Sequence, residues 1–137
     1  QQACMTSSNG LNGSQTVVFS NEEKSLPTSI LNKEKNSLEF TDAFFNETPT
    51  LFLENMASSY VTLIDNHNTM KVSIMGYKYL AFWKKPEANF ICIEPWHSHT
   101  DFEEFKGDFF EREGTIILKP KRIYTTTHSL IAGVKEN

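Results

Sequence analysis

The carboxylate of Glu94 is the clearest chemical signal in the chain, because it follows the apolar run 90–93 and directly precedes Pro95. This order predicts the C-terminal end of a strand, where proline cannot continue the hydrogen-bond ladder. Burial there disfavours the charged form of a carboxylate and makes it a better proton acceptor, as a general base requires. Trp83 and Trp96 offer aromatic faces on which a sugar could stack. Taken alone, however, these residues are more typical of a solvated strand-end carboxylate beside core tryptophans.

Two histidines and an aspartate alternate in the run 97–101. The run is similar to the zinc-binding segment of metallo-β-lactamase-type hydrolases, in which closely spaced His and Asp side chains hold the metal. Phe102 stands where those proteins carry a further histidine, and only His128 follows downstream. We therefore expect a polar loop at the rim of the site, with His97 in contact with a ligand, and no catalytic metal.

Two further groups of charges have simpler interpretations. The acidic stretch 101–108 offers oxygen ligands of the kind that calcium prefers, but its spacing matches no calcium loop, and a solvated face is the simpler interpretation. Lys84 and Lys85 are typical of a charged turn. Contact with the phosphate of a sugar phosphate is the alternative for this pair.

Composition excludes several classes of protein. The chain has 137 residues, the length of one domain, and a net charge of −4 with no basic stripe, so we expect no nucleic-acid partner. No apolar run approaches the roughly 18 residues of a membrane span, so we expect no membrane partner. Cys4 and Cys92 lack metal-type spacing. Both are expected to be reduced, which favours a cytoplasmic location.

The elements that position Glu94 are expected to be strands. Residues 1–14, rich in Ser, Asn and Gly, predict a mobile tail or loop, and 15–137 predict a β-sandwich. Short alternating segments separated by turn residues indicate seven or eight strands, and hence an all-β fold. The expected segments include a hairpin of 59–65 with 70–75, strands at 50–53, 79–83 and 90–94, a closing hairpin of 116–118 with 122–130, and a helical turn near 28–31.

An ordered set of short motifs supports a family resemblance. The chain carries, in this order, Tyr79–Leu80–Ala81–Phe82–Trp83–Lys84–Lys85–Pro86, Phe90–Ile91–Cys92–Ile93–Glu94–Pro95–Trp96, Asp101, Gly107–Asp108–Phe109, Glu113–Gly114 and Leu118–Lys119–Pro120. Together these motifs resemble the C-terminal half of an aldose 1-epimerase (galactose mutarotase), of the branch found beside lactose-utilisation genes. The resemblance covers residues 40–130 and implies the C-terminal portion of a galactose mutarotase-like supersandwich, so that 15–137 form part of a larger domain.

The resemblance also implies a mechanism that interconverts the α and β anomers of a hexose. In that family a glutamate removes the proton of the anomeric hydroxyl while a histidine protonates the ring oxygen, and the opened sugar closes on its other face. Neither a metal nor a cofactor takes part. By position Glu94 is the base, and Trp83, Trp96 and His97 are expected to contact the hexose or related sugar.

The chain departs from the family pattern in three places. The acid histidine of those enzymes lies in an N-terminal half that is absent here. His97–Ser98 replaces a Tyr–Gly pair, and Glu47–Thr48–Pro49 stands where relatives carry Asp–Ala. We therefore expect a missing N-terminal half, or a second copy, to complete the sandwich. The alternative function is a non-catalytic carbohydrate-binding β-sandwich module, in which the fold is kept and the acid is lost.

Overall fold

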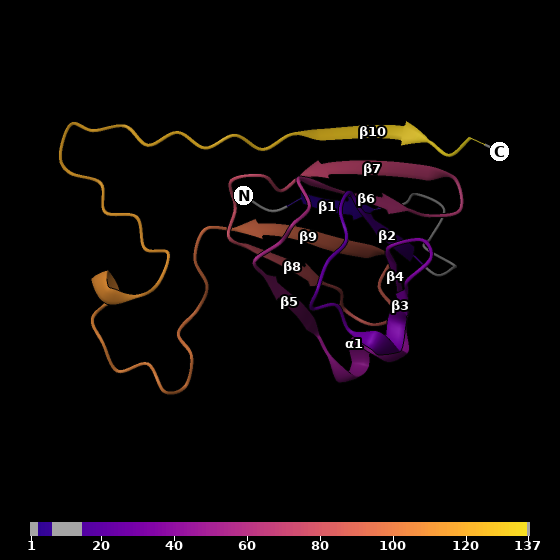
Figure 1. Cartoon of the computed structure of the whole chain (residues 1–137), viewed down its shortest axis with the longest axis horizontal. Helices are drawn as coiled ribbons and strands as arrows, with labels where there is room; N and C mark the ends of the chain where they lie inside the picture. Colours follow the sequence, from indigo (N-terminus) through magenta and orange to yellow (C-terminus); the bar gives the residue numbers. More distant parts are fainter. Residues whose placement is uncertain (1–2, 7–14, 137) are drawn as a thin grey trace.

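The computed structural model describes residues 3–6 and 15–136, and they form two antiparallel sheets packed as a β-sandwich (Figure 1). The first sheet consists, in spatial order, of β1 (Ala3–Thr6), β9 (Phe90–Trp96), β8 (Tyr79–Trp83) and β5 (Thr50–Glu54). The second consists of β10 (Leu130–Val134), β7 (Asn68–Ser73), β6 (Tyr60–Ile64), β2 (Gln15–Phe19), β4 (Ser37–Phe40) and β3 (Leu31–Asn32). The predicted all-β sandwich is confirmed. The predicted tail 1–14 lies outside the described residues, except for β1.

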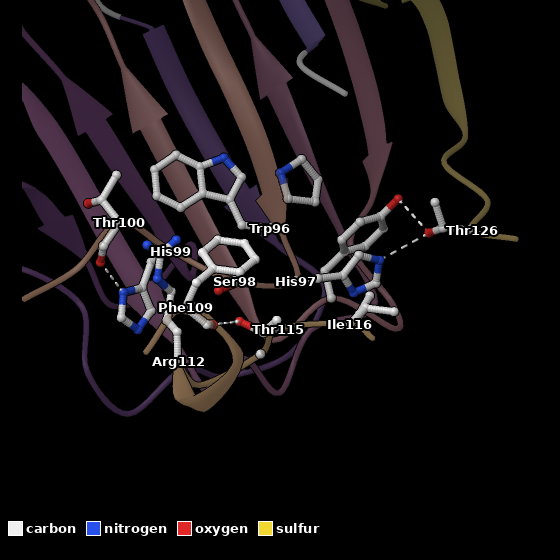
Figure 2. Close-up of a pocket in the computed structure, with 13 residues that line it drawn as sticks. Trp96, His97, Ser98, His99, Thr100, Phe109, Arg112, Thr115, Ile116 and Thr126 are labelled. Atoms are coloured by element: carbon white, nitrogen blue, oxygen red, sulfur yellow. Dashed lines mark hydrogen bonds between the residues drawn. The ribbon is translucent and has the colours of Figure 1, made fainter. Parts of the chain in front are cut away.

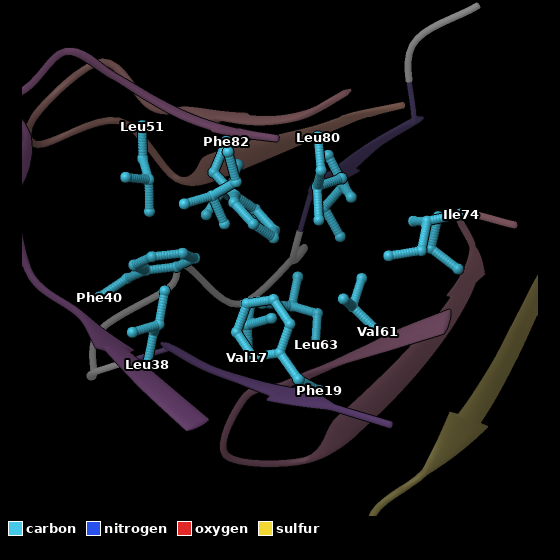
Figure 3. Close-up of a cluster of buried hydrophobic side chains, with 14 of the residues drawn as sticks. Val17, Phe19, Leu38, Phe40, Leu51, Val61, Leu63, Ile74, Leu80 and Phe82 are labelled. Carbon is cyan, nitrogen blue, oxygen red and sulfur yellow. The ribbon is translucent and has the colours of Figure 1, made fainter. Parts of the chain in front are cut away.

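The core lies between the two sheets, and alternation along the strands builds it. In β2, Val17 and Phe19 are buried, whereas Val18 between them is only partly so. Apolar side chains of the two sheets face each other across this layer (Figure 3). Members of the cluster from the six-stranded sheet include Val17, Phe19, Leu38, Phe40, Val61, Leu63 and Val72, and those from the four-stranded sheet include Leu51, Leu53, Leu80, Phe82, Ile91 and Ile93. Full burial of each such side chain contributes roughly 1.5–3 kcal/mol.

The predicted central hairpin is confirmed as β6 and β7, which pair from Tyr60 with Ser73 to Ile64 with Thr69. Its turn depends on Asp65, whose Oδ1 accepts hydrogen bonds from the amides of His67 (2.7 Å) and Asn68 (2.6 Å). Burial alone would raise the pKa of the Asp65 carboxyl, but these amide bonds outweigh it and hold the pKa below its ordinary value. By capping the turn, the Asp65 side chain helps to determine where β6 ends and β7 begins.

Helices are short in the described part of the chain. The predicted turn near residue 28 is confirmed as the 3-10 helix η1 (Thr28–Ile30). The α-helix α1 (Asp42–Glu47) was not predicted, although Thr41 caps it by accepting a hydrogen bond from the Phe44 amide (3.1 Å). Another 3-10 helix, η2 (Phe109–Glu111), follows β9. No helix among the described residues is long and apolar enough to cross a bilayer.

The predicted closing hairpin is wrong. Lys121 does form a turn, with φ 62° and a hydrogen bond from the Arg122 amide to the Lys119 carbonyl (3.1 Å), but 116–118 and 122–129 are not strands. These segments belong to a long excursion that leaves the end of β9, passes through η2 and returns as β10 along the border of the sandwich (Figure 1). The alternation of apolar and polar residues that suggested two strands does not lead to pairing, because the two segments form no ladder with each other.

The expectation of reduced cysteines is also wrong, because Cys92 is disulfide-bonded. The backbone pairing of β1 with β9 places Cys4, the only other cysteine in the sequence, opposite Cys92. The sequence could not reveal this, since the two residues are far apart along the chain and share no motif. Disulfides persist in oxidising surroundings. The cytoplasmic expectation rested on reduced cysteines, so it loses its support.

Candidate functional site

Glu94 lies in β9 opposite Ala81 of β8, and its side chain faces away from the core. This orientation follows from alternation, since Ile91 and Ile93 belong to the core cluster between the sheets. Glu94 nevertheless is only 5% exposed. The carboxylate is therefore buried on the outer face of the four-stranded sheet, instead of solvated as its local sequence favoured.

The predicted end of the strand at Pro95 is wrong, because β9 continues to Trp96. Pro95 pairs with Leu80 and Trp96 with Tyr79, so the strand keeps its partner β8. On its other side β9 pairs with β1 only over residues 90–93. Proline is tolerated where a strand has a free edge, which explains why the ladder survives it.

Aromatic side chains lie on the outer face on either side of Glu94. Trp83, 37% exposed, packs against Phe90 with ring centroids 5.3 Å apart, near the Cys92 end of the strand pair. Towards the other end, the Phe52 ring packs against Tyr79 (5.1 Å) and Trp96 (5.9 Å). Glu94 therefore stands between two aromatic groups on a single sheet face.

His99 covers the second of these aromatic groups. Its ring meets the Tyr79 ring edge-on at 5.0 Å and the Phe52 ring at 5.8 Å, and it lies 4.3 Å from the Phe102 ring. Its Nδ1 lies 2.5 Å from the Thr100 carbonyl oxygen, so this nitrogen carries the proton when the ring is neutral. His99 thus joins the face on which Glu94 lies.

A pocket of about 560 Å³ opens where β9 ends (Figure 2). Its lining combines aromatic rings with hydroxyl, imidazole and guanidinium groups, and consists of Tyr77, Pro95, Trp96, His97, Ser98, His99, Thr100, Phe109, Arg112, Gly114, Thr115, Ile116 and Thr126. Two of the predicted site residues, Trp96 and His97, therefore meet in one pocket. The other two, Glu94 and Trp83, are not part of its lining.

His97 joins three parts of the chain in one wall of this pocket. Its ring stacks on Tyr77 with centroids 4.5 Å apart, and its Nε2 lies 3.2 Å from the Thr126 hydroxyl and 3.3 Å from the Tyr124 hydroxyl. The Thr126 hydroxyl also donates to the Tyr77 hydroxyl (3.1 Å). Tyr77, Tyr124 and Thr126 were missed, since Thr126 had been interpreted only as a strand former and no local motif distinguishes the tyrosines.

The excursion after β9 supplies a further part of the pocket lining. Ser98 donates to the Glu113 carbonyl (2.8 Å), and Gly114 passes so close to the His97 carbonyl oxygen that a Cβ there would overlap it. Gly114 also has φ +78°, which favours glycine. An ion pair with Lys78 lowers the pKa of the Glu113 carboxyl through its hydrogen bond and raises that of Lys78. These contacts hold residues 112–115 against the end of β9.

Arg112 brings the pocket its one guanidinium group. Its Nε lies 2.5 Å from Oδ1 of Asp101 in an ion pair, although the angles are not those of a hydrogen bond. The guanidinium also lies over the Phe109 ring, 4.7 Å from its centroid. Asp101 therefore offsets the positive charge of Arg112 at the pocket.

The histidine-rich run 97–101 does not form a metal centre in the described part of the chain, where no three His, Cys, Asp or Glu side chains are placed to hold an ion. Lys84 also differs from the expected turn residue, since it is only 7% exposed and pairs with Asp42 of α1. The hydrogen bond from Lys84 lowers the pKa of the Asp42 carboxyl, against a smaller opposing effect of burial. Lys84 thus attaches α1 to the four-stranded sheet.

No protein-family model, curated protein or solved structure matches this chain. Its function is therefore inferred from the residues and the geometry of the site.

Proposed function

We propose that this chain is an aldose 1-epimerase-like protein with a galactose mutarotase-like sandwich, which binds a hexose and interconverts its α and β anomers. The observation that carries the proposal is a buried carboxylate, Glu94, on a sheet face lined by aromatic side chains. Aromatic rings beside a carboxylate suit a sugar, because the rings cover its C–H faces while the carboxylate takes the proton of a hydroxyl.

In the proposed reaction Glu94 removes the proton of the anomeric hydroxyl, and the bond between C1 and the ring oxygen breaks as that oxygen gains a proton. Rotation about C1–C2 then exposes the other face of the aldehyde, and the reverse proton transfers close the ring. His99 is the histidine that contacts the Phe52 and Tyr79 rings on the Glu94 face. We therefore assign the proton donor to His99, with Glu94 as its counterpart.

One observation favours the second candidate, a carbohydrate-binding module without catalysis. The pocket at the end of β9 holds Trp96 and His97, whereas Glu94 lies outside its lining and is only 5% exposed. A sugar in this pocket would stack on Trp96 and meet the hydroxyl and imidazole groups without touching the base. Catalysis therefore requires the sugar to extend past Trp96 onto the face that carries Glu94. Binding without catalysis does not require this.

The deciding experiment measures exchange between the α and β anomers of glucose and galactose by NMR, with and without the protein. Exchange faster than in buffer, lost in Glu94→Gln and retained in Glu39→Gln, supports the enzyme. Glu39 is a matched control because it is an exposed strand carboxylate in the other sheet. Sugar binding with exchange at the buffer rate supports the module, and a folded protein that neither binds nor accelerates excludes both candidates.

A further inference from the structure

Strand β10 borders the six-stranded sheet, and all five of its residues are exposed. Leu130 is 48% and Val134 78% exposed, although Val72, the neighbour of Leu130 in β7, is fully buried. The six-stranded sheet therefore extends beyond the part that the four-stranded sheet covers. Figure 1 shows β10 along the border of the molecule, continuing the line of the extended segment before it.

The backbone of β10 offers a free hydrogen-bonding edge. The Ser129 carbonyl accepts from the Ser73 amide and the Lys135 amide donates to the His67 carbonyl, both at 2.9 Å. In an antiparallel ladder alternate residues direct both backbone groups to the same neighbour, so odd-numbered residues of β10 face β7. The amides and carbonyls of Leu130, Ala132 and Val134 consequently face outward, where no strand lies among the described residues.

Natural sheets usually protect such an edge with charges, proline or a covering element. The sequence of β10, Leu130–Ile131–Ala132–Gly133–Val134, contains neither a charge nor a proline, and no described strand lies beyond it in the sheet. Three of the thirteen exposed large apolar side chains among the described residues, Leu130, Ile131 and Val134, lie on this one strand. An uncharged and unprotected edge of this kind is a template for pairing with another strand.

We propose that a second copy of this chain pairs its β10 antiparallel with this edge, about a two-fold axis through Ala132. This register gives each outward-facing residue an outward-facing partner, because Ala132 meets its own equivalent and Leu130 meets Val134 of the second copy. All the free amides and carbonyls of the strand are then satisfied. The two six-stranded sheets join into one continuous sheet with an isologous interface.

The side chains are self-complementary in the same register. Leu130, Ala132 and Val134 share the face of the sheet to which Val72 belongs, so apolar side chains of the two copies meet directly across the new ladder. Beyond the strand, Glu136 lies opposite His128 of the second copy, and Lys135 lies opposite Ser129. No like charges oppose each other in this register.

The test is the molar mass of the protein in solution, by light scattering and sedimentation over a range of concentrations. The wild-type protein is expected at twice the 15.7 kDa of one chain. Ala132→Pro removes an amide that points only to the free edge, so it should raise the dissociation constant of the dimer more than about tenfold and leave the sandwich folded. Ala132→Thr keeps the amide and should remain dimeric.

Val134→Lys is a second variant, which keeps every amide and places a cation opposite Leu130 of the other copy. It should also weaken the dimer, while its circular dichroism matches that of the wild type. A monomeric wild-type protein would overturn the proposal and leave the edge for a strand of a different polypeptide. A dimer that tolerates both Ala132→Pro and Val134→Lys would overturn it as well, because its interface would then lie elsewhere.

Discussion

The His97 ring stacks on the Tyr77 ring with their centroids 4.5 Å apart and their planes at 27°. This contact joins the residue after β9 to the segment before β8. The hydroxyls of Tyr124 and Thr126 close the arrangement around His97 Nε2. One imidazole thus contacts three segments of the chain beside the pocket, which Tyr77, His97 and Thr126 help to line.

Gly114→Ala should loosen the pocket wall more than Gly76→Ala loosens its own turn. Both glycines have positive φ, +78° and +88°, so each alanine incurs a backbone cost of roughly 1–2 kcal/mol. Only at Gly114 does the added methyl also overlap the His97 carbonyl, whereas nothing lies within 4 Å of a Cβ at Gly76. Hydrogen exchange at 97–99 and 112–116 measures the effect. Equal exchange in the two variants would contradict the close packing at Gly114.

Trp96→Ala and Trp83→Ala should distinguish the two positions for a bound sugar. Trp96 lies both in the pocket and on the Glu94 face, whereas Trp83 lies on that face alone. A sugar held in the pocket should lose affinity in Trp96→Ala only, and a sugar extending over Glu94 should lose affinity in both variants. Titration followed by NMR measures the dissociation constants. Unchanged affinity in both variants would remove the aromatic residues from the binding site.

The ion pair between Asp42 and Lys84 should make stability depend on pH. Its hydrogen bond from Lys84 lowers the Asp42 pKa in the folded state, so the stabilisation is present above the unfolded pKa of about 3.9 and is lost as pH falls through the lower folded value. The Asp42 side chain is 47% exposed, so the contribution is about 1 kcal/mol or less.

Urea unfolding of the wild type and Asp42→Asn measures this contribution. The wild type should be more stable at neutral pH, and the two curves should converge in acid, because protonated Asp42 then resembles asparagine. Glu39→Gln, at an exposed strand position, serves as the control and should show no such convergence. If the difference in unfolding free energy between the wild type and Asp42→Asn stayed constant across the acid range, the ion pair would be excluded as the source of that difference.

The disulfide of Cys92 should be detectable by peptide mapping under non-reducing conditions. The sequence contains one other cysteine, so the linked peptide should contain Cys4 together with Cys92. Replacing Cys92 with Ser should lower the free energy of unfolding by about 2–4 kcal/mol. Without the disulfide no cross-link closes a long loop in the unfolded chain, so the conformational entropy of the unfolded state rises. Two free thiols in the unfolded, unreduced protein would contradict the bond.

Local patterns were sufficient to predict much of the sandwich. The alternation in 59–65 and 70–75 predicted β6 and β7, and the turn residues between them predicted their connection. The apolar run before Glu94 likewise predicted the strand β9. These predictions succeed because side-chain period and turn chemistry are properties of neighbouring residues.

Only the tertiary structure decided which distant segments meet. It placed Trp96 and His97 in the pocket and Glu94 and Trp83 outside it, and it paired β10 with β7 instead of with 116–118. It also placed Cys4 opposite Cys92. No local pattern encodes these relationships, because strand pairing and pocket closure depend on long-range packing that a stretch of neighbouring residues does not contain.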